Sequence, residues 1–218
     1  MRREIIGNCE LYLGDCMDLM KQFPDNHFDF AIIDPPWGVN AGCSGLKKRS
    51  KGAIKIYNDI PPENNYFNEL FRISKNQIIC GANLFLKYIS NMTGGWVFWD
   101  KCNHYKIFSD GELIWVSCEN KIIKYTFDMG YSRGFDYENR IHPNQKPCQL
   151  YNFLLNKYTK QGDRVIDTHF GSGSIAIACN EMNVNLTAIE IDPDYFNAAC
   201  DRIKTAAAQK TFNFMEAL

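Results

Sequence analysis

Four adjacent residues combine a carboxylate, a rigid backbone and an aromatic ring: Asp34, Pro35, Pro36 and Trp37. They follow the apolar run 28–33, which is typical of a buried strand and places the carboxylate at its C-terminal end. The two prolines stiffen the turn and remove two N–H donors, so carbonyl acceptors remain beside the ring. Such acceptors suit an exocyclic amino group on a flat heterocycle, such as adenine or cytosine. A simple strand-capping turn is the alternative interpretation.

A glycine-containing segment near the C-terminus provides a second candidate site. Residues 164–174 read Arg-Val-Ile-Asp-Thr-His-Phe-Gly-Ser-Gly-Ser, which predicts a strand, a turn and the beginning of a helix. Ser172 or Ser174 is available as the N-cap of that helix. Glycines let the backbone approach a bound molecule closely, and free N–H groups at a helix start favour an anionic group such as a carboxylate.

An acidic residue ends the next predicted strand, residues 186–191. Glu190 lies 19 residues after Gly171. This is near the spacing of about 20 at which an acid meets ribose hydroxyls in nucleotide-binding βαβ units. The order of strand, glycine turn, helix and acidic strand end therefore predicts a nucleotide-type cofactor site.

Taken together, residues 34–37 and 167–173 resemble the S-adenosylmethionine-dependent amino-methyltransferases of DNA, whose hallmark is Asp/Ser/Asn-Pro-Pro-aromatic. The catalytic motif precedes the cofactor motif, an order similar to the permuted beta class of that family. Residues 142–147, His-Pro-Asn-Gln-Lys-Pro, resemble a stretch that this class carries just upstream of the cofactor strand. The resemblance runs from about residue 11 to residue 203 and implies a Rossmann-like methyltransferase fold with permuted motif order.

The resemblance implies that a methyl group passes from S-adenosylmethionine to the exocyclic nitrogen of a base flipped out of DNA. Asp34 and the carbonyl of Pro35 would accept hydrogen bonds from that amine, which favours a nitrogen lone pair directed at the methyl carbon. Pro36 would keep the turn rigid, and Trp37 would stack on the base.

The resemblance also implies a set of cofactor-binding residues. Gly171, Ser172 and Gly173 would pass close to the methionine part of the cofactor. The family usually has Asp-Pro-Phe at the end of the cofactor strand, whereas this chain has Asp-Thr-His with the aromatic displaced to Phe170, so either His169 or Phe170 would form the cofactor wall. The full implied set is Asp15, His142, Gln145, Lys146, Asp167, His169, Phe170, Gly171, Ser172, Gly173, Glu190 and Ile191.

Four of these residues have more specific implied roles. Asp167 would face the amino group of the cofactor, Glu190 would take the ribose hydroxyls and Ile191 would pack on the adenine ring. Asp15 would accept from the adenine amino group, or serve as the N-cap of a helix over 16–22, and the two roles are compatible. Residues 142–147 would border the methionine end through backbone groups.

An aspartate at the start of the motif favours N6 of adenine over N4 of cytosine, as a tendency of the family. The motif order and the 142–147 stretch favour DNA over RNA. The prediction is a site-specific adenine DNA methyltransferase, of the kind found in restriction-modification, that uses S-adenosylmethionine and no metal. An N4-cytosine enzyme, an RNA N6-adenine enzyme and a non-catalytic cofactor-binding subunit stay open as alternatives. A Rossmann-type oxidoreductase is disfavoured because Gly-x-Gly-x-x-Gly is absent.

Two segments are candidates for nucleic-acid contacts. Residues 38–60 predict a mobile basic loop that holds phosphates and closes over a flipped nucleotide, or else a solvated charged loop. Residues 101–141 predict a small target-recognition insertion, with arginines interleaved among aromatics, or else a structural loop. The candidate contact residues are Lys47, Lys48, Arg49, Lys51, Arg133 and Arg140.

The elements that position these motifs alternate along the chain. Helical patterns over 16–22, 64–74, 83–89 and 150–158, and after residue 192, separate strand-like segments over 10–13, 28–33, 77–81, 95–100, 164–167 and 186–191. This alternation predicts a single α/β domain over 1–218, with a doubly wound, mostly parallel sheet. Residues 113–116 and 122–127 predict a β-hairpin return.

Composition limits the class of protein. The net charge of −1 over 218 residues means that any DNA binding depends on local basic patches. Nine scattered cysteines without a Cys-x-x-Cys pair favour reduced thiols, a cytoplasmic location and no zinc site. No apolar run reaches about 18 residues, so we expect a soluble protein without membrane contact. Phe212, Phe214 and Met215 could pack on the body or on a second subunit, which leaves a homodimer open.

Overall fold

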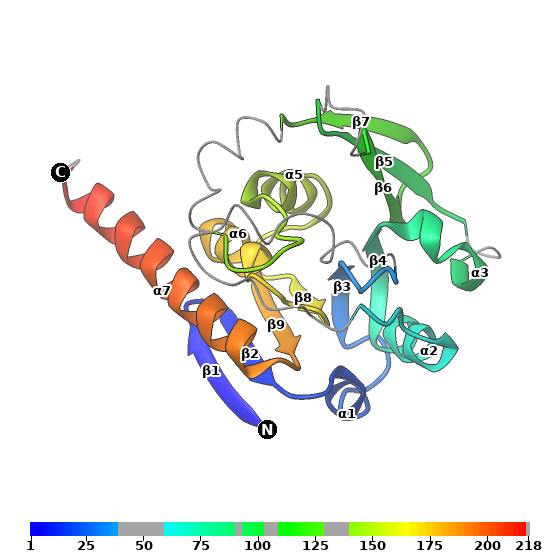
Figure 1. Ribbon diagram of the computed structural model, residues 1–218. Helices are drawn as coiled ribbons and strands as arrows, with labels where there is room; N and C mark the ends of the chain where they lie inside the picture. Colours follow the sequence, from blue (N-terminus) through cyan, green and yellow to red (C-terminus); the bar gives the residue numbers. More distant parts are fainter. Residues whose placement is uncertain (39–58, 90–92, 103–108, 129–139, 217–218) are drawn as a thin grey trace.

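The computed structural model describes residues 1–38, 59–89, 93–102, 109–128 and 140–216, with side chains up to residue 209. Figure 1 shows the arrangement of the elements. In chain order they are β1 (Arg2–Ile6), β2 (Cys9–Leu13), α1 (Cys16–Met20), β3 (Phe28–Ile33), α2 (Asn64–Ile73), β4 (Ser74–Cys80), the 3₁₀ helix η3 (Ala82–Leu84), α3 (Leu86–Ile89), β5 (Gly95–Asp100), β6 (Gly111–Val116), β7 (Ile122–Thr126), α5 (Cys148–Tyr158), β8 (Arg164–Asp167), α6 (Ser174–Met182), β9 (Asn185–Glu190) and α7 (Pro193–Glu216).

The described strands form one sheet in the order β1-β2-β9-β8-β3-β4-β6-β5-β7. Neighbours from β2 to β4 run parallel, whereas β1 and β6 run antiparallel to the strands beside them. From β3 the chain moves outward to β4, and from β8 it moves in the opposite direction to β9. β3 and β8 are paired, so the strand order reverses between them, which is where open α/β sheets bind their ligands.

Helices cover both faces of the sheet, as a doubly wound fold requires. On one face, Ile32 of β3 packs in a hydrophobic cluster with residues of α5, α6 and α7. On the other face, Ala31 and Ile33 pack in a second cluster with residues of α1 and α2. Because β3 is buried on both faces, residues 30–33 are apolar without alternation, and Asp29 near the start of the strand is the one polar residue. The doubly wound prediction is confirmed.

The predicted hairpin between residues 113–116 and 122–127 is wrong in its pairing. β6 forms antiparallel pairs with both β4 and β5, so both of its edges are occupied. β7 therefore pairs in parallel with the outer edge of β5, with Trp96 opposite Ile122. The antiparallel return is made by β5 and β6, and these strands belong to the main sheet.

β1 forms one edge of the sheet, next to β2. The sequence did not predict this strand, because three of its five residues are charged. α7 extends well beyond the sheet and ends away from it (Figure 1). None of the helices in the described ranges combines the length and the apolar composition that crossing a membrane requires.

Candidate active site

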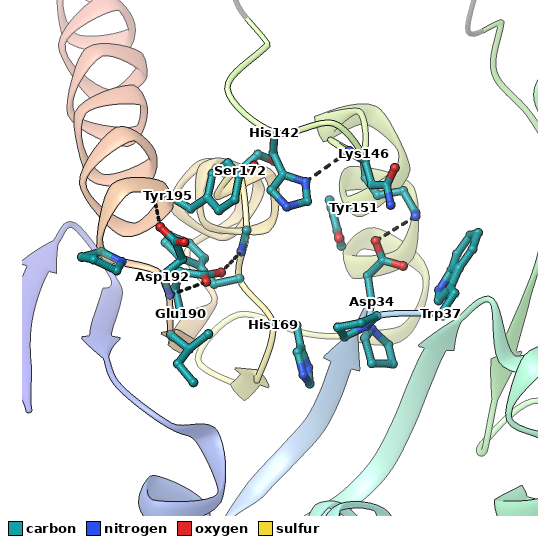
Figure 2. A pocket seen from close by; sticks show the side chains of 17 residues that line it. Asp34, Trp37, His142, Lys146, Tyr151, His169, Ser172, Glu190, Asp192 and Tyr195 are labelled. Atoms are coloured by element: carbon teal, nitrogen blue, oxygen red, sulfur yellow. Dashed lines mark hydrogen bonds and ion pairs between the residues drawn. The ribbon is translucent and has the colours of Figure 1, made fainter. Parts of the chain in front are cut away.

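One pocket of about 270 Å³ lies beyond the carboxyl ends of β3, β8 and β9 (Figure 2). It brings the two sequence motifs together, because Asp34 follows β3 and the glycine turn follows β8. The predicted site residues that line it are Asp34, Pro35, Pro36, Trp37, His142, Lys146, His169, Phe170, Gly171, Ser172, Glu190 and Ile191. Asp15, Gln145, Asp167 and Gly173 are not among its lining residues.

The carboxylate of Asp34 forms an ion pair with a buried lysine. Lys146 Nζ lies 2.8 Å from Asp34 Oδ2 and 3.2 Å from Glu112 Oε2. The same ammonium lies 4.7 Å from the centroid of the Trp37 ring. The sequence predicted that Lys146 binds the cofactor. In the structure its ammonium contacts Asp34 and Trp37 of the Asp-Pro-Pro-Trp motif (Figure 2).

The charges around Asp34 influence one another. Burial raises the pKa of Asp34, and the Lys146 ammonium opposes that shift. Burial works to lower the pKa of Lys146, but Asp34 and Glu112 outweigh it and raise that pKa. Burial likewise disfavours ionised Glu112, yet Lys146 and Lys101 bring its pKa below the usual value. Lys146 is therefore a buried cation stabilised by two carboxylates.

Two polar atoms of the motif lack hydrogen-bond partners within the described part of the chain. They are Asp34 Oδ1 and Trp37 Nε1, and both are buried. The turn itself is held from outside, because Asp59 Oδ1 accepts hydrogen bonds from the backbone N–H groups of Trp37 at 3.0 Å and Gly38 at 3.1 Å. A buried acceptor without a partner is costly, so Asp34 Oδ1 suits a ligand that supplies a donor.

The opposite side of the pocket contains the acid that ends β9. Glu190 Oε2 accepts a hydrogen bond from the backbone N–H of Gly171 at 2.9 Å, and its Oε1 accepts one from the backbone N–H of Asp192 at 2.8 Å. Burial raises the pKa of Glu190, and these backbone donors oppose the shift. The carboxylate is thus fixed in orientation at the pocket wall.

Two histidines of the wall are neutral at neutral pH. Burial lowers the pKa of His142 to about 4, helped by Lys146, and burial also lowers that of His169 to about 4. His142 Nδ1 accepts the backbone N–H of Asn144 at 3.2 Å, and its ring lies 4.5 Å from that of Tyr195. His169 and Phe170 both line the pocket, so both stay predicted residues of the cofactor wall.

The predicted residues outside the pocket lining have structural contacts. Asp15 Oδ1 accepts from the backbone N–H of Met17 at 2.8 Å, which confirms its role as the N-cap of α1. Gln145 Oε1 accepts from the backbone N–H of Ile141 at 3.2 Å.

Asp167 is buried in the strand end that precedes the glycine turn. Its Oδ1 accepts from the backbone N–H of His169 at 3.0 Å, and burial raises the pKa of the carboxyl to about 8. The direct cofactor contacts predicted for Asp15, Gln145 and Asp167 therefore stay predictions.

The predicted serine N-cap of the helix after β8 is wrong. Gly173 occupies the cap position of α6, with a left-handed φ of 73°, and no side chain caps the helix. Ser174 Oγ instead donates to the carbonyl of Lys146 at 2.7 Å, and Ser172 Oγ shares a hydrogen bond with it at 3.2 Å. These hydroxyls connect the glycine turn to the 142–147 stretch.

The candidate nucleic-acid contacts fall mostly outside the described residues. Lys47, Lys48, Arg49 and Lys51 lie there, as does Arg133. Arg140 is described, is partly buried and begins the segment that leads into the 142–147 stretch. Of the described residues, no group of three or more His, Cys, Asp and Glu is arranged to hold a metal ion.

The sequence did not indicate several residues of the site. Glu112 lay within the predicted recognition insertion, and it reaches Lys146 because β6 pairs with β4, the strand next to β3. Asp59 lies 22 residues after the turn that it supports. The other pocket residues that were not predicted are Asn144, Tyr151, Asp192, Pro193 and Tyr195. Asn144 lay within the 142–147 stretch already singled out, so that motif was the available signal.

The pocket thus lies at the switch point of a mostly parallel sheet. The glycine turn and the acidic strand end form one side of it, and Asp-Pro-Pro-Trp forms the other. A family model described as DNA methylase, N6_N4_Mtase, matches residues 127–201. The type II methyltransferase M2.MboI of Moraxella bovis is 24% identical over 231 residues, covering 86% of this chain and 85% of the relative.

Solved structures agree with this match. A structure titled as the complex of M1.HpyAVI with S-adenosylmethionine superposes with a TM-score of 0.60 at 20% identity, covering 89% of this chain and 99% of that one. The cytosine-N4-specific PvuII DNA methyltransferase gives a TM-score of 0.59 at 12% identity, covering 91% of each chain. The chain is thus similar to DNA methylases of the N6/N4 type over residues 127–201 and to a type II methyltransferase over most of its length, a similarity that the motifs predicted.

Proposed function

We propose that this protein is a site-specific DNA methyltransferase that transfers a methyl group from S-adenosylmethionine to N6 of an adenine flipped out of the duplex. The observation that carries the proposal is the buried, unpaired Oδ1 of Asp34 in the pocket wall, at the strand end next to the glycine turn. A base amine is a donor that would satisfy this acceptor.

The Asp-Pro-Pro-Trp motif forms the side of the pocket that would hold the target base, here called the base side, and its residues act on the target amine. The lone pair of an amine conjugated to a purine is shared with the ring, which makes the nitrogen a poor nucleophile. Hydrogen bonds accepted by Asp34 and by the Pro35 carbonyl favour a pyramidal nitrogen with an available lone pair. Trp37 lines the pocket and supplies a ring face on which the base can stack.

The glycine turn and the end of β9 form the opposite side of the pocket, here called the cofactor side, and their residues suit S-adenosylmethionine. Glu190 offers carboxylate oxygens at the pocket wall for ribose hydroxyls, and Ile191 offers exposed apolar surface for the adenine ring. A Cβ added at Gly171 would meet no described atom nearer than 3.8 Å, so glycine keeps that part of the pocket open for the methionine part. S-adenosylmethionine, when bound, supplies a methyl group activated by its sulfonium charge.

Asp rather than Ser at position 34 supports adenine as the target base. An N4-cytosine enzyme is the second candidate, because the fold of the cytosine-N4-specific PvuII methyltransferase superposes over 91% of this chain. Both bases present an exocyclic amine, so the unpaired Oδ1 of Asp34 suits either.

Labelled methyl transfer to unmethylated duplex DNA, followed by mass spectrometry of the nucleosides, tests the proposal. The native chain should produce N6-methyladenine, and Asp34→Ala should abolish it while it still binds S-adenosylmethionine. Asp18→Ala, which removes an exposed carboxylate on α1, is the matched control and should retain activity.

Three other outcomes would count against the proposal. N4-methylcytosine would overturn the choice of base but keep the use of Asp34. A cofactor-bound protein that leaves DNA unmethylated would contradict DNA as the substrate. Full activity in Asp34→Ala would contradict the assigned role of the motif.

A further inference from the structure

Lys146 connects three parts of the fold through one buried ammonium. Its side chain is 7% exposed, and Nζ contacts Asp34 at the end of β3, Glu112 on β6 and the ring of Trp37. Its own backbone carbonyl is held by Ser174 Oγ at 2.7 Å, at the start of α6. Lys146 is therefore held both at its ammonium and at its backbone carbonyl.

Glu112 extends this contact into a network with balanced charge. It forms a second ion pair with Lys101, which follows directly after β5. Two cations and two carboxylates are thus joined in the order Lys101, Glu112, Lys146 and Asp34. Among ion pairs of the described residues, the Lys146 pairs have the least exposed cation, whereas Arg72, Lys75 and Lys124 pair nearer to solvent.

We propose that Lys146 is a positioning residue for Asp34 and that Glu112 in turn positions Lys146. Lys146 fixes Oδ2 of Asp34, so that the carboxylate stays ionised and its buried Oδ1 stays unpaired for the amine of the target base. This proposal rests on the proposed function and moves Lys146 from the cofactor side of the pocket to the base side.

The physical need follows from the surroundings of Asp34. A buried carboxylate without a counter-charge takes up a proton and loses acceptor strength. The other titratable groups of the described chain that face Asp34 cannot supply that charge. Cys80 on β4 and Tyr151 on α5 are neutral because burial raises both pKa values, and Asp167 on β8 is itself an acid. The Lys101 ammonium also lowers the pKa of Asp34, but less than Lys146 does, and its ion pair is with Glu112.

Stability alone does not account for this network. Burying two cations and two carboxylates costs desolvation, and apolar side chains of similar volume often stabilise a fold equally well. What apolar side chains cannot do is keep one Asp34 oxygen anchored and the other negative. The expected signature is therefore a change in the charge state of Asp34 and in turnover, rather than only in stability.

The test compares Lys146→Met, Lys146→Arg and Glu112→Gln with the native chain. Lys75→Met, which removes an exposed lysine paired with Asp29, is the control. The first readout is the ¹³C carboxyl resonance of Asp34 followed against pH without DNA or cofactor and assigned through Asp34→Asn. The second is the S-adenosylmethionine dissociation constant, and the third is kcat at saturating cofactor.

Lys146→Met should shift the Asp34 titration to higher pH and lower kcat about 100-fold, while cofactor affinity changes less than about 3-fold. Lys146→Arg should keep the titration near the native one and restore part of kcat, because it retains the cation. Glu112→Gln removes a negative charge that raises the pKa of Asp34, so it should shift the Asp34 titration to lower pH. Because Lys146 loses one of its two carboxylate partners, kcat should still fall, by less than in Lys146→Met. If Lys146→Met does not fold, this combination of a lower titration pH and a lower kcat tests the proposal.

Two results would overturn the inference. An unchanged Asp34 titration in both Lys146→Met and Glu112→Gln would show that Lys146 does not control its charge. Cofactor binding weakened 10-fold or more with unchanged kcat would return Lys146 to the cofactor side. If the native chain methylates no DNA, the proposed function fails, whereas the carboxyl titration still decides the role of Lys146.

Discussion

The carboxylate of Glu190 accepts a hydrogen bond at 2.9 Å from the backbone N–H of Gly171, so the acid that ends β9 holds the glycine turn that follows β8. Its other oxygen accepts from the backbone of Asp192 at 2.8 Å. The sequence spacing of 19 residues indicated that acid and glycine would meet a common ligand. The structure adds that they also contact each other, so loss of the acid would loosen the turn.

Glu190→Gln should weaken S-adenosylmethionine binding by about 10-fold or more, since one charged acceptor is lost and the amide presents N–H to a backbone donor. Turnover at saturating cofactor should stay within a few-fold of the native value, because Glu190 is not among the contacts of Asp34. Calorimetric titration with the cofactor measures the first quantity. Glu10→Gln, on the neighbouring strand β2 and partly exposed, is the control. Native affinity in Glu190→Gln would remove this residue from the cofactor site.

The buried histidines of the pocket wall predict a pH-dependent stability. The pKa values of His142 and His169 are lowered to about 4 in the folded state, below the ordinary value of about 6.5. Between these two pH values the unfolded chain binds more protons than the folded chain. The free energy of unfolding therefore falls as pH falls through this window.

At pH 5 each histidine should cost about 2 kcal/mol of stability relative to pH 7. Replacing both by glutamine should flatten this dependence. Urea unfolding of the native chain and of His142→Gln/His169→Gln at pH 7 and pH 5 measures it, and the difference between the two pH values cancels the packing cost of the substitutions. Equal pH dependence in both proteins would mean that these rings charge freely in the folded state.

The sequence predicted the elements whose signals are local. The strand Phe28–Ile33 has the predicted limits, because a mostly apolar run ends at a charged residue and two prolines. The glycine turn before α6 and the acid at the end of β9 follow for similar reasons. The reversal of strand order between β3 and β8 then brings the two predicted half-sites into one pocket.

The errors concern contacts that depend on tertiary packing. Nothing near residues 122–127 shows that both edges of β6 are occupied, so the edge partner of β7 could not be inferred. Ser174 has the residue type of an N-cap, yet its hydroxyl binds the carbonyl of Lys146. The partner of Lys146 is Asp34, 112 residues away, and local spacing cannot reveal an ion pair between segments so far apart.

The glycine at the start of α6 allows backbone strain to be separated from crowding. Gly173 has φ of 73°, and an added Cβ would lie 3.1 Å from Ile203 Cδ1 and from Phe170 Cζ. Gly162 also has a left-handed φ, 87°, but an added Cβ there would meet no described atom within 4 Å. Gly162→Ala should therefore cost about 1 kcal/mol from backbone strain alone.

Gly173→Ala should cost more, roughly 2 kcal/mol or above, because the turn or the two apolar neighbours must also shift. Urea unfolding of both variants gives the difference. Since the turn carries Gly171, whose N–H holds Glu190, Gly173→Ala should also weaken cofactor binding, whereas Gly162→Ala should not. Equal losses of stability with unchanged cofactor affinity would mean that Ile203 and Phe170 accommodate a methyl group, and that glycine is needed at position 173 only for its backbone conformation.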